Sequence, residues 1–143
     1  MKKVMFLCTG NACRSQMAEG FARERGKGLI EAHSAGLLAA GVHPRAIAVM
    51  NEIGIDISHQ RSKTIDEALL GSMDLVVTLC DNAAEACPWT PPEVTRVHMP
   101  VKDPVGTRGS EQKIMKDFQR ARDEIEATVL GIIAMLQQKQ QGQ

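Results

Sequence analysis

Short apolar runs alternate with helix-like apolar patterns over most of the chain. The run Lys3–Cys8 (KVMFLC) is mostly apolar and stops at a glycine-containing turn, which is typical of a buried strand. The β-branched run Asp74–Leu79 (DLVVTL) is a second strong strand signal. Further strands are expected at Leu29–Ser34, ending at Ala35 and Gly36, and at Val94–Met99. Apolar residues three or four positions apart predict helices from Arg14 to about Gly26, from Pro44 to about Ile53 and at Asp66–Leu70.

From Gln112 onward the chain has the pattern of one long amphipathic helix. Its apolar positions recur every three or four residues, which places them on one face. We expect this face to pack on the sheet rather than to bind a partner, and residues from about 137 to 143 to form a frayed tail. The apolar face consists of Ile114, Phe118, Ala121, Ile125, Val129, Ile132 and Leu136.

The alternation of strands and helices predicts the fold class. It favours an α/β domain with a four-stranded parallel sheet, right-handed crossovers and helices on both faces. With four strands the expected order is 2-1-3-4, and residues 1–143 form a single domain. This order puts the carboxyl end of the first strand, where Cys8 stands, at the switch point at which such sheets bind ligands.

Composition and charge exclude several function classes. The 143 residues carry 17 basic and 17 acidic side chains, so no long-range positive field exists to gather nucleic-acid phosphates. Aromatic residues make up only 3%, which argues against a surface for stacking single-stranded bases. Neither a signal peptide nor a membrane span is expected, so we expect a cytoplasmic chain with no membrane partner. We also expect a monomer, since nothing in the sequence demands a larger assembly. Four cysteines in a reducing compartment are more often catalytic, redox-active or metal-binding than structural.

The segment between the first strand and the first helix carries the most specific chemistry. It places five residues between Cys8 and Arg14, and a loop of that length can turn several N–H groups inward around an anion. The N-terminus of the following helix adds positive potential, which also favours the nucleophilic thiolate of Cys8. Arg14 can donate two hydrogen bonds to two oxygens of a tetrahedral oxyanion. Gly10 is expected to allow a backbone conformation that a side chain would forbid, and Ser15 is placed to donate a hydrogen bond to the Cys8 sulfur. The expected oxyanion-binding residues are Thr9, Gly10, Asn11, Ala12, Cys13 and Arg14.

The sequence CTGNACRS at a strand-to-helix junction resembles the active-site loop of the low-molecular-weight protein tyrosine phosphatase superfamily, C-x-G-N-x-C-R-S. That resemblance implies the same fold, with Cys8 as nucleophile and Cys13 as a loop cysteine without an essential redox role. The pair Asp103-Pro104 stands where the superfamily carries its general acid, so the resemblance makes Asp103 the residue that protonates the departing oxygen.

Two features separate this chain from the tyrosine phosphatases. It has no tyrosine, whereas those enzymes usually carry tyrosines after the Asp-Pro pair, and it has the segment Cys80–Pro88 (CDNAAEACP) after the third predicted strand. Together with NACRSQMAEG, EAHSAG and KDPVGTRGS, this segment resembles the thioredoxin-coupled arsenate reductases. The resemblance implies arsenate reduction for arsenic detoxification by Cys8, Cys80 and Cys87 in turn, without a cofactor. Cys80 and Cys87 would form the final disulfide, and thioredoxin would open it.

Several alternatives stay open at this stage. A phosphatase acting on phosphoesters is the nearest, because phosphate has almost the shape of arsenate and, like sulfate, competes for such a loop. A zinc module built from the four cysteines and a sensor of thiol oxidation are two others, although the cysteine spacings do not suit common zinc sites. Some relatives bind a monovalent cation through Asn11, Glu19 and the segment here reading His59–Lys63. Because that segment is basic in this chain, we expect no bound cation or metal; a lysine ammonium could take its place.

Overall fold

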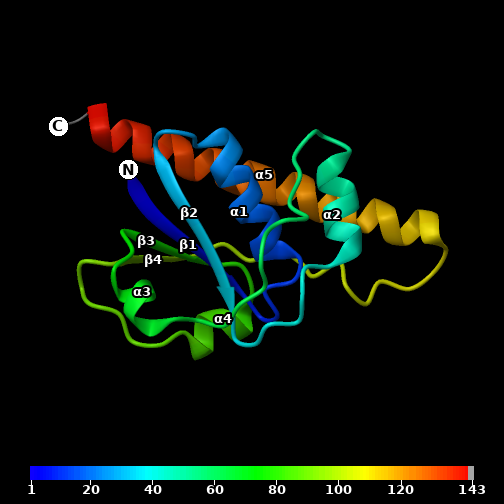
Figure 1. Ribbon diagram of the computed structural model, residues 1–143, viewed down its shortest axis with the longest axis horizontal. Helices are drawn as coiled ribbons and strands as arrows, with labels where there is room; N and C mark the ends of the chain where they lie inside the picture. Colours follow the sequence, from blue (N-terminus) through cyan, green and yellow to red (C-terminus); the bar gives the residue numbers. More distant parts are fainter. Residues whose placement is uncertain (142–143) are drawn as a thin grey trace.

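The computed structural model describes residues 1–141, and a four-stranded parallel sheet lies at its centre (Figure 1). The strand order is β2-β1-β3-β4, and each neighbouring pair is parallel, which confirms the predicted fold class and order. In this register Cys8 pairs with Gly36 and Leu7 pairs with Thr78. The strands are β1 (Lys2–Cys8), β2 (Ile30–Gly36), β3 (Leu75–Thr78) and β4 (Thr95–His98).

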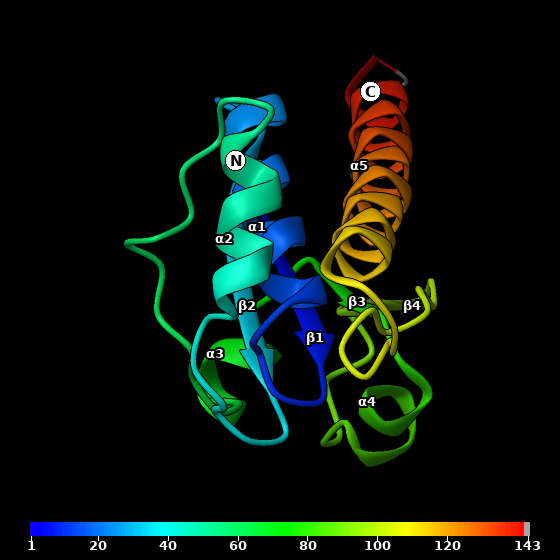
Figure 2. The same cartoon turned by 90° about the vertical axis from the view of Figure 1, so that its right-hand side faces the viewer.

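Helices cover both faces of the sheet (Figure 2). One face carries α1 (Arg14–Arg25), α2 (Pro44–Asn51) and α5 (Glu111–Gln141). The other carries the short helices α3 (Glu67–Gly71) and α4 (Asp81–Ala86). Helix α5 continues to Gln141, so residues 137–141 are helical where a frayed tail was expected, and residues 142 and 143 lie outside the described residues.

Side-chain alternation along β1 divides the core into two parts. Val4 and Phe6 point into the larger part, under α1 and α5, while Met5 and Leu7 point into the smaller part on the opposite face. The apolar face of α5 packs into the larger part, as predicted. Its buried members are Phe118, Ala121, Ile125, Val129, Ile132, Ile133 and Leu136.

Apart from the end of α5, the boundaries of the predicted elements differ from the expected ones by one or two residues, for local reasons. Helix α3 begins after Asp66 because that carboxylate caps the helix and accepts from the Leu69 N–H. Helix α2 ends at Asn51 rather than near Ile53, because the chain turns there and Gly54 takes a positive φ of 81°. These differences leave the sheet and its carboxyl edge as predicted.

The carboxyl edge of the sheet is where the candidate chemistry gathers. Strands β1 and β3 are neighbours, so Cys8 at the end of β1 and Cys80 just after β3 emerge side by side. Among residues 1–141, none of the helices has the length and apolar character needed to cross a lipid bilayer.

Candidate active site

The loop after β1 lines a hollow of about 200 Å³ at the carboxyl edge of the sheet. Cys8 lies at its base and is 3% exposed. Arg14 and Asp103 both line the hollow, together with Ala40 and Val105. The remaining lining residues are Thr9, Gly10, Ala12 and Cys13. The structure therefore brings the nucleophile, the arginine and the acid that the sequence predicted around one small cavity.

Each reactive group has a defined partner. The Cys8 Sγ lies 2.8 Å from the Ser15 Oγ, as expected from their positions. Arg14 donates from Nη1 to the Val101 carbonyl at 3.0 Å, and its Nη2 lies 3.5 Å from the Asp103 carboxylate. Asp103 is 46% exposed at its side chain and accepts from the Val105 N–H at 2.9 Å. The carboxylate thus faces both the cavity and solvent, where a proton donor needs to be.

The special backbone conformation of the loop belongs to Asn11, which corrects the expectation for Gly10. Asn11 has a φ of 45°, whereas Gly10 is not among the residues of positive φ. Asparagine tolerates the left-handed region better than most side chains, because its amide bonds locally. Space at Gly10 is tight instead, since a Cβ there would lie 3.2 Å from the Ala40 Cβ and one of the two would have to shift slightly.

The buried Asn11 side chain holds the loop together. Its Nδ2 donates to Ser15 Oγ at 2.8 Å and to Ser34 Oγ at 3.0 Å. Its Oδ1 accepts from Gln16 Nε2 at 3.0 Å and from the Lys63 N–H at 2.9 Å. Asn11 is fully buried, so all of these bonds are protected from water. Ser15, the partner of the Cys8 sulfur, is thereby fixed by the same amide.

Sequence reasoning missed the role of the segment that follows β2. A Cβ on Gly36 would lie 2.6 Å from both the Asn11 nitrogen and the Leu38 carbonyl oxygen, so only glycine fits there. Beyond it, the N–H groups of Leu38 and Ala40 donate to the Thr9 and Gly10 carbonyls. The Ala35-Gly36 pair was read only as a strand end, although a glycine closing a strand is also a sign of close backbone approach.

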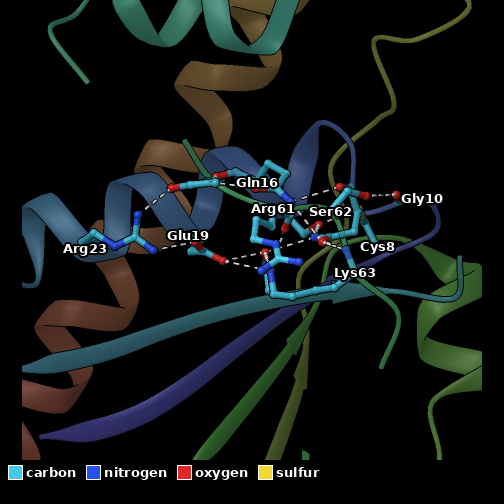
Figure 3. A network of polar contacts seen from close by, with 12 residues as sticks. Cys8, Gly10, Gln16, Glu19, Arg23, Arg61, Ser62 and Lys63 are labelled. Atoms are coloured by element: carbon cyan, nitrogen blue, oxygen red, sulfur yellow. Dashed lines mark hydrogen bonds and ion pairs between the residues drawn. The ribbon is translucent and has the colours of Figure 1, made fainter. Parts of the chain in front are cut away.

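The basic segment before Lys63 meets the loop through a polar network (Figure 3). Glu19 lies between two cations, with Arg23 Nη2 at 2.6 Å and Lys63 Nζ at 3.5 Å from its carboxylate oxygens. The same ammonium donates to the Arg61 carbonyl at 2.9 Å and to Ser34 Oγ at 3.5 Å. A lysine ammonium therefore occupies the position beside Glu19 that the sequence suggested for it.

Cys80 lies beside the loop, and Cys87 lies at the far end of α4. The Cys80 Sγ is 3.3 Å from the Thr9 Oγ1 and accepts from the Ala83 N–H at 3.4 Å, so it caps α4. Cys87 is half-buried at the other end of the same helix. Burial raises the pKa of the Cys87 thiol, and Arg96 partly offsets this rise. All four cysteines are free thiols in this structure.

Cys13 differs from the other cysteines. It precedes α1 and packs into the larger part of the core. Burial raises the pKa of its thiol strongly, and the nearby charges of Asp103 and Cys8 add to the rise. Its environment therefore suits a structural thiol better than a redox one.

The structure gives no support to the zinc alternative. Within residues 1–141, no three side chains drawn from histidine, cysteine, aspartate and glutamate come together as a metal ion would require.

Comparisons with known proteins agree with this site. Residues 3–142 match the family model of the low molecular weight phosphotyrosine protein phosphatases. The chain is 51% identical over 124 residues to an arsenate reductase of Bacillus subtilis, a match that covers 87% of this chain and 89% of the relative. It also resembles the structure of an arsenate reductase in the phosphate-binding state, with 39% identity, a TM-score of 0.77 and coverage of 95% of this chain and 99% of the other. An arginine phosphatase from Geobacillus stearothermophilus has a TM-score of 0.82 at 25% identity, with coverage of 99% and 97%.

Proposed function

The chain belongs to the low molecular weight phosphotyrosine protein phosphatase family, and we propose that within this family it is an enzyme that reduces arsenate to arsenite for detoxification. The observation that carries this proposal is the position of Cys80. Its sulfur lies beside Thr9, the residue after the nucleophile, and Cys87 follows at the other end of α4. A phosphatase needs the loop alone, whereas a reductase needs a second thiol within reach of the first.

The first step uses the loop chemistry that the family shares. Arsenate binds in the hollow against the inward N–H groups and the Arg14 guanidinium. The Cys8 thiolate attacks arsenic, and an S–As bond forms while one As–O bond breaks. Asp103 gives its proton to the departing oxygen, which leaves as water. Ser15, at 2.8 Å, donates to the sulfur and stabilises it as an anion before attack.

The second step moves two electrons onto arsenic. The Cys80 thiolate attacks the Cys8 sulfur, a Cys8–Cys80 disulfide forms, and the electron pair of the S–As bond stays with arsenic. Arsenic(V) becomes arsenic(III), and arsenite leaves. Thr9 supports this step, because its hydroxyl lies within hydrogen-bonding distance of the attacking sulfur.

The third step carries the disulfide away from the anion site. The Cys87 thiolate attacks the Cys80 sulfur, which forms a Cys80–Cys87 disulfide and returns Cys8 as a thiolate. Cys87 is more exposed than Cys8 or Cys80, so an external dithiol can reach this disulfide. We propose thioredoxin as that dithiol and the cytoplasm as the compartment. Trp89, 80% exposed and two residues beyond Cys87, offers an apolar side chain for a partner to cover.

A phosphatase activity is the second candidate, and the likeness to an arginine phosphatase favours it. The first step would be the same with a phosphoester, and water would then release phosphate from Cys8. Against it, the chain has no tyrosine, and the aliphatic Val105 stands on the cavity wall after the Asp-Pro pair. Hydrolysis of p-nitrophenyl phosphate measures this activity directly.

The proposal is tested by arsenate-dependent NADPH oxidation with thioredoxin and thioredoxin reductase. We expect many turnovers from the wild type and about one or fewer from the Cys87→Ser variant, whose disulfide stays within the anion site. No arsenate-dependent loss of NADPH with the wild type would reject the thioredoxin-coupled mechanism. A rapid hydrolysis of p-nitrophenyl phosphate under the same conditions would favour the phosphatase instead.

A further inference from the structure

A polar link joins the sheet to the short helix α4. His98, the last residue of β4, places its Nε2 2.9 Å from Oδ1 of Asp81, the first residue of α4. Its Nδ1 lies 2.8 Å from the Oγ1 of Thr78, which is its partner in the sheet register. With a neutral ring, Thr78 donates to Nδ1 and Nε2–H donates to Asp81. The imidazole is thus fixed to the sheet through one nitrogen and holds α4 through the other.

Helix α4 has few other contacts to keep it in place. It is six residues long, and Ala83 is its only fully buried side chain among the described residues. An isolated helix of this length is not stable in water, so tertiary contacts decide whether it forms. Two hydrogen bonds hold its first turn. The Ala83 N–H donates to the Cys80 sulfur, and the Asp81 carboxylate bonds to the His98 ring.

The proposed disulfide conflicts with this helix. Cys87 follows Cys80 by seven positions, which in a regular α-helix corresponds to about 10 Å along the axis. A disulfide needs Cα atoms about 4.4 to 6.8 Å apart, so α4 must lose its helical form when the bond closes. Asp81 follows Cys80 directly and moves with it, whereas His98 and Thr78 belong to the sheet. The contact between His98 and Asp81 therefore belongs to the dithiol state.

We propose that His98 is a positioning residue of the thiol cascade, which holds α4 in its dithiol form through Asp81 and so opposes closure of the Cys80–Cys87 disulfide. This inference rests on the proposed function. In the step concerned, the Cys87 thiolate forms the new bond to the Cys80 sulfur while the Cys8–Cys80 bond breaks and Cys8 leaves as a thiolate, so no outside oxidant is needed. Thioredoxin then reduces the Cys80–Cys87 disulfide and becomes oxidised itself. By stabilising the dithiol product, the link makes this last reduction more complete.

The test is the redox equilibrium between the protein and thioredoxin, read by alkylation and mass spectrometry. The variant His98→Phe keeps a ring of similar size and removes both polar contacts. An exposed hydrogen bond to a carboxylate is weak, so we expect the equilibrium to shift about two- to fivefold toward the protein disulfide. The matched control is His33→Phe, which removes a similar contact between His33 Nε2 and Glu31 on β2, at 2.7 Å, and should leave the equilibrium unchanged.

A second substitution separates the link from a general effect of changing β4. Asp81 is 83% exposed at its side chain, so Asp81→Ala, which removes the acceptor of the His98 Nε2–H, does not endanger folding. It should shift the equilibrium in the same direction, and His98→Phe should add little in the Asp81→Ala background. Equal shifts for His98→Phe and His33→Phe would overturn the inference. So would fully additive shifts for His98→Phe and the Asp81 substitution. If the wild type forms no Cys80–Cys87 disulfide at all, the proposed function fails first, and the two failures are thus told apart.

Discussion

At the scale of single residues, Asn11 combines a strained backbone with four buried hydrogen bonds. We predict that Asn11→Ala and Asn11→Gly both destabilise the protein, because both leave buried donors and acceptors unpaired. The free energy of unfolding should be about 1 kcal/mol lower for the alanine variant than for the glycine variant, because alanine is also strained in the left-handed conformation. Urea unfolding of the two variants measures the difference directly. An alanine variant as stable as the glycine variant would contradict this view of the loop.

Lys63 is the second residue whose role can be isolated. Its ammonium shares the Glu19 carboxylate, which is only 6% exposed at its side chain, with Arg23. Lys63→Ala removes one of the two charges that neutralise this carboxylate, so we predict lower arsenate turnover and partial recovery on adding potassium ions. The exposed Lys27→Ala variant serves as the control and should respond to neither change. Equal activity of Lys63→Ala with and without potassium, at the wild-type level, would show that the ammonium has no such role.

The sequence predicted the chemistry of these residues better than their conformations. Cys8 and Arg14 were expected from their spacing in a loop between strand and helix, whereas Asp103 was expected only from the resemblance of the Asp-Pro pair to the family; all three line one hollow. The positive φ was expected at Gly10 and lies at Asn11, because the choice between neighbouring loop positions depends on long-range partners such as Ser34 and Lys63. Those partners are remote in sequence, and no local pattern reveals them.

At the scale of secondary-structure elements, the end of β2 supports the catalytic loop. We predict that Gly36→Ala destabilises the protein by about 1–3 kcal/mol and weakens oxyanion binding, because the added methyl group would displace Asn11 or Leu38. Gly131 in α5 is the matched control, since a Cβ there has no neighbours within 4 Å. Gly131→Ala should stabilise the protein by up to about 1 kcal/mol through helix propensity. Thermal unfolding and phosphate titration together measure both effects.

Cys87, at the end of helix α4, is half-buried. In the reduced protein, burial raises the pKa of this thiol above that of an ordinary cysteine, so less thiolate is present at neutral pH. We predict that alkylation of Cys87 by iodoacetamide has its pH midpoint above that of a free cysteine. Unfolding with urea should lower this midpoint to the ordinary value. A midpoint in the folded protein at or below the ordinary value would contradict the environment described for Cys87.

At the scale of the whole molecule, the hydrophobic pattern predicted the elements, and general rules for parallel α/β sheets predicted their order. The apolar runs that became β1 and β3 were expected as strands and the amphipathic stripe of α5 as a packed helix face, and the expected order 2-1-3-4 is the observed one. The segments between them were not predictable in the same way. Gln60, for example, is buried against Gln16 through hydrogen bonds to its side chain and backbone, a contact without periodicity in the sequence.

The proposed thiol cascade requires that one chain reduces one arsenate with its own thiols and ends with the disulfide between Cys80 and Cys87. The most direct measurement is a single turnover without any external reductant, with arsenite counted and the disulfides mapped by mass spectrometry. We predict about one arsenite per chain for the wild type, ending in a Cys80–Cys87 disulfide. The Cys87→Ser variant should end in a Cys8–Cys80 disulfide, and Cys80→Ser should release no arsenite. Arsenite release by Cys80→Ser, or a wild-type product that retains all four thiols, would contradict the cascade.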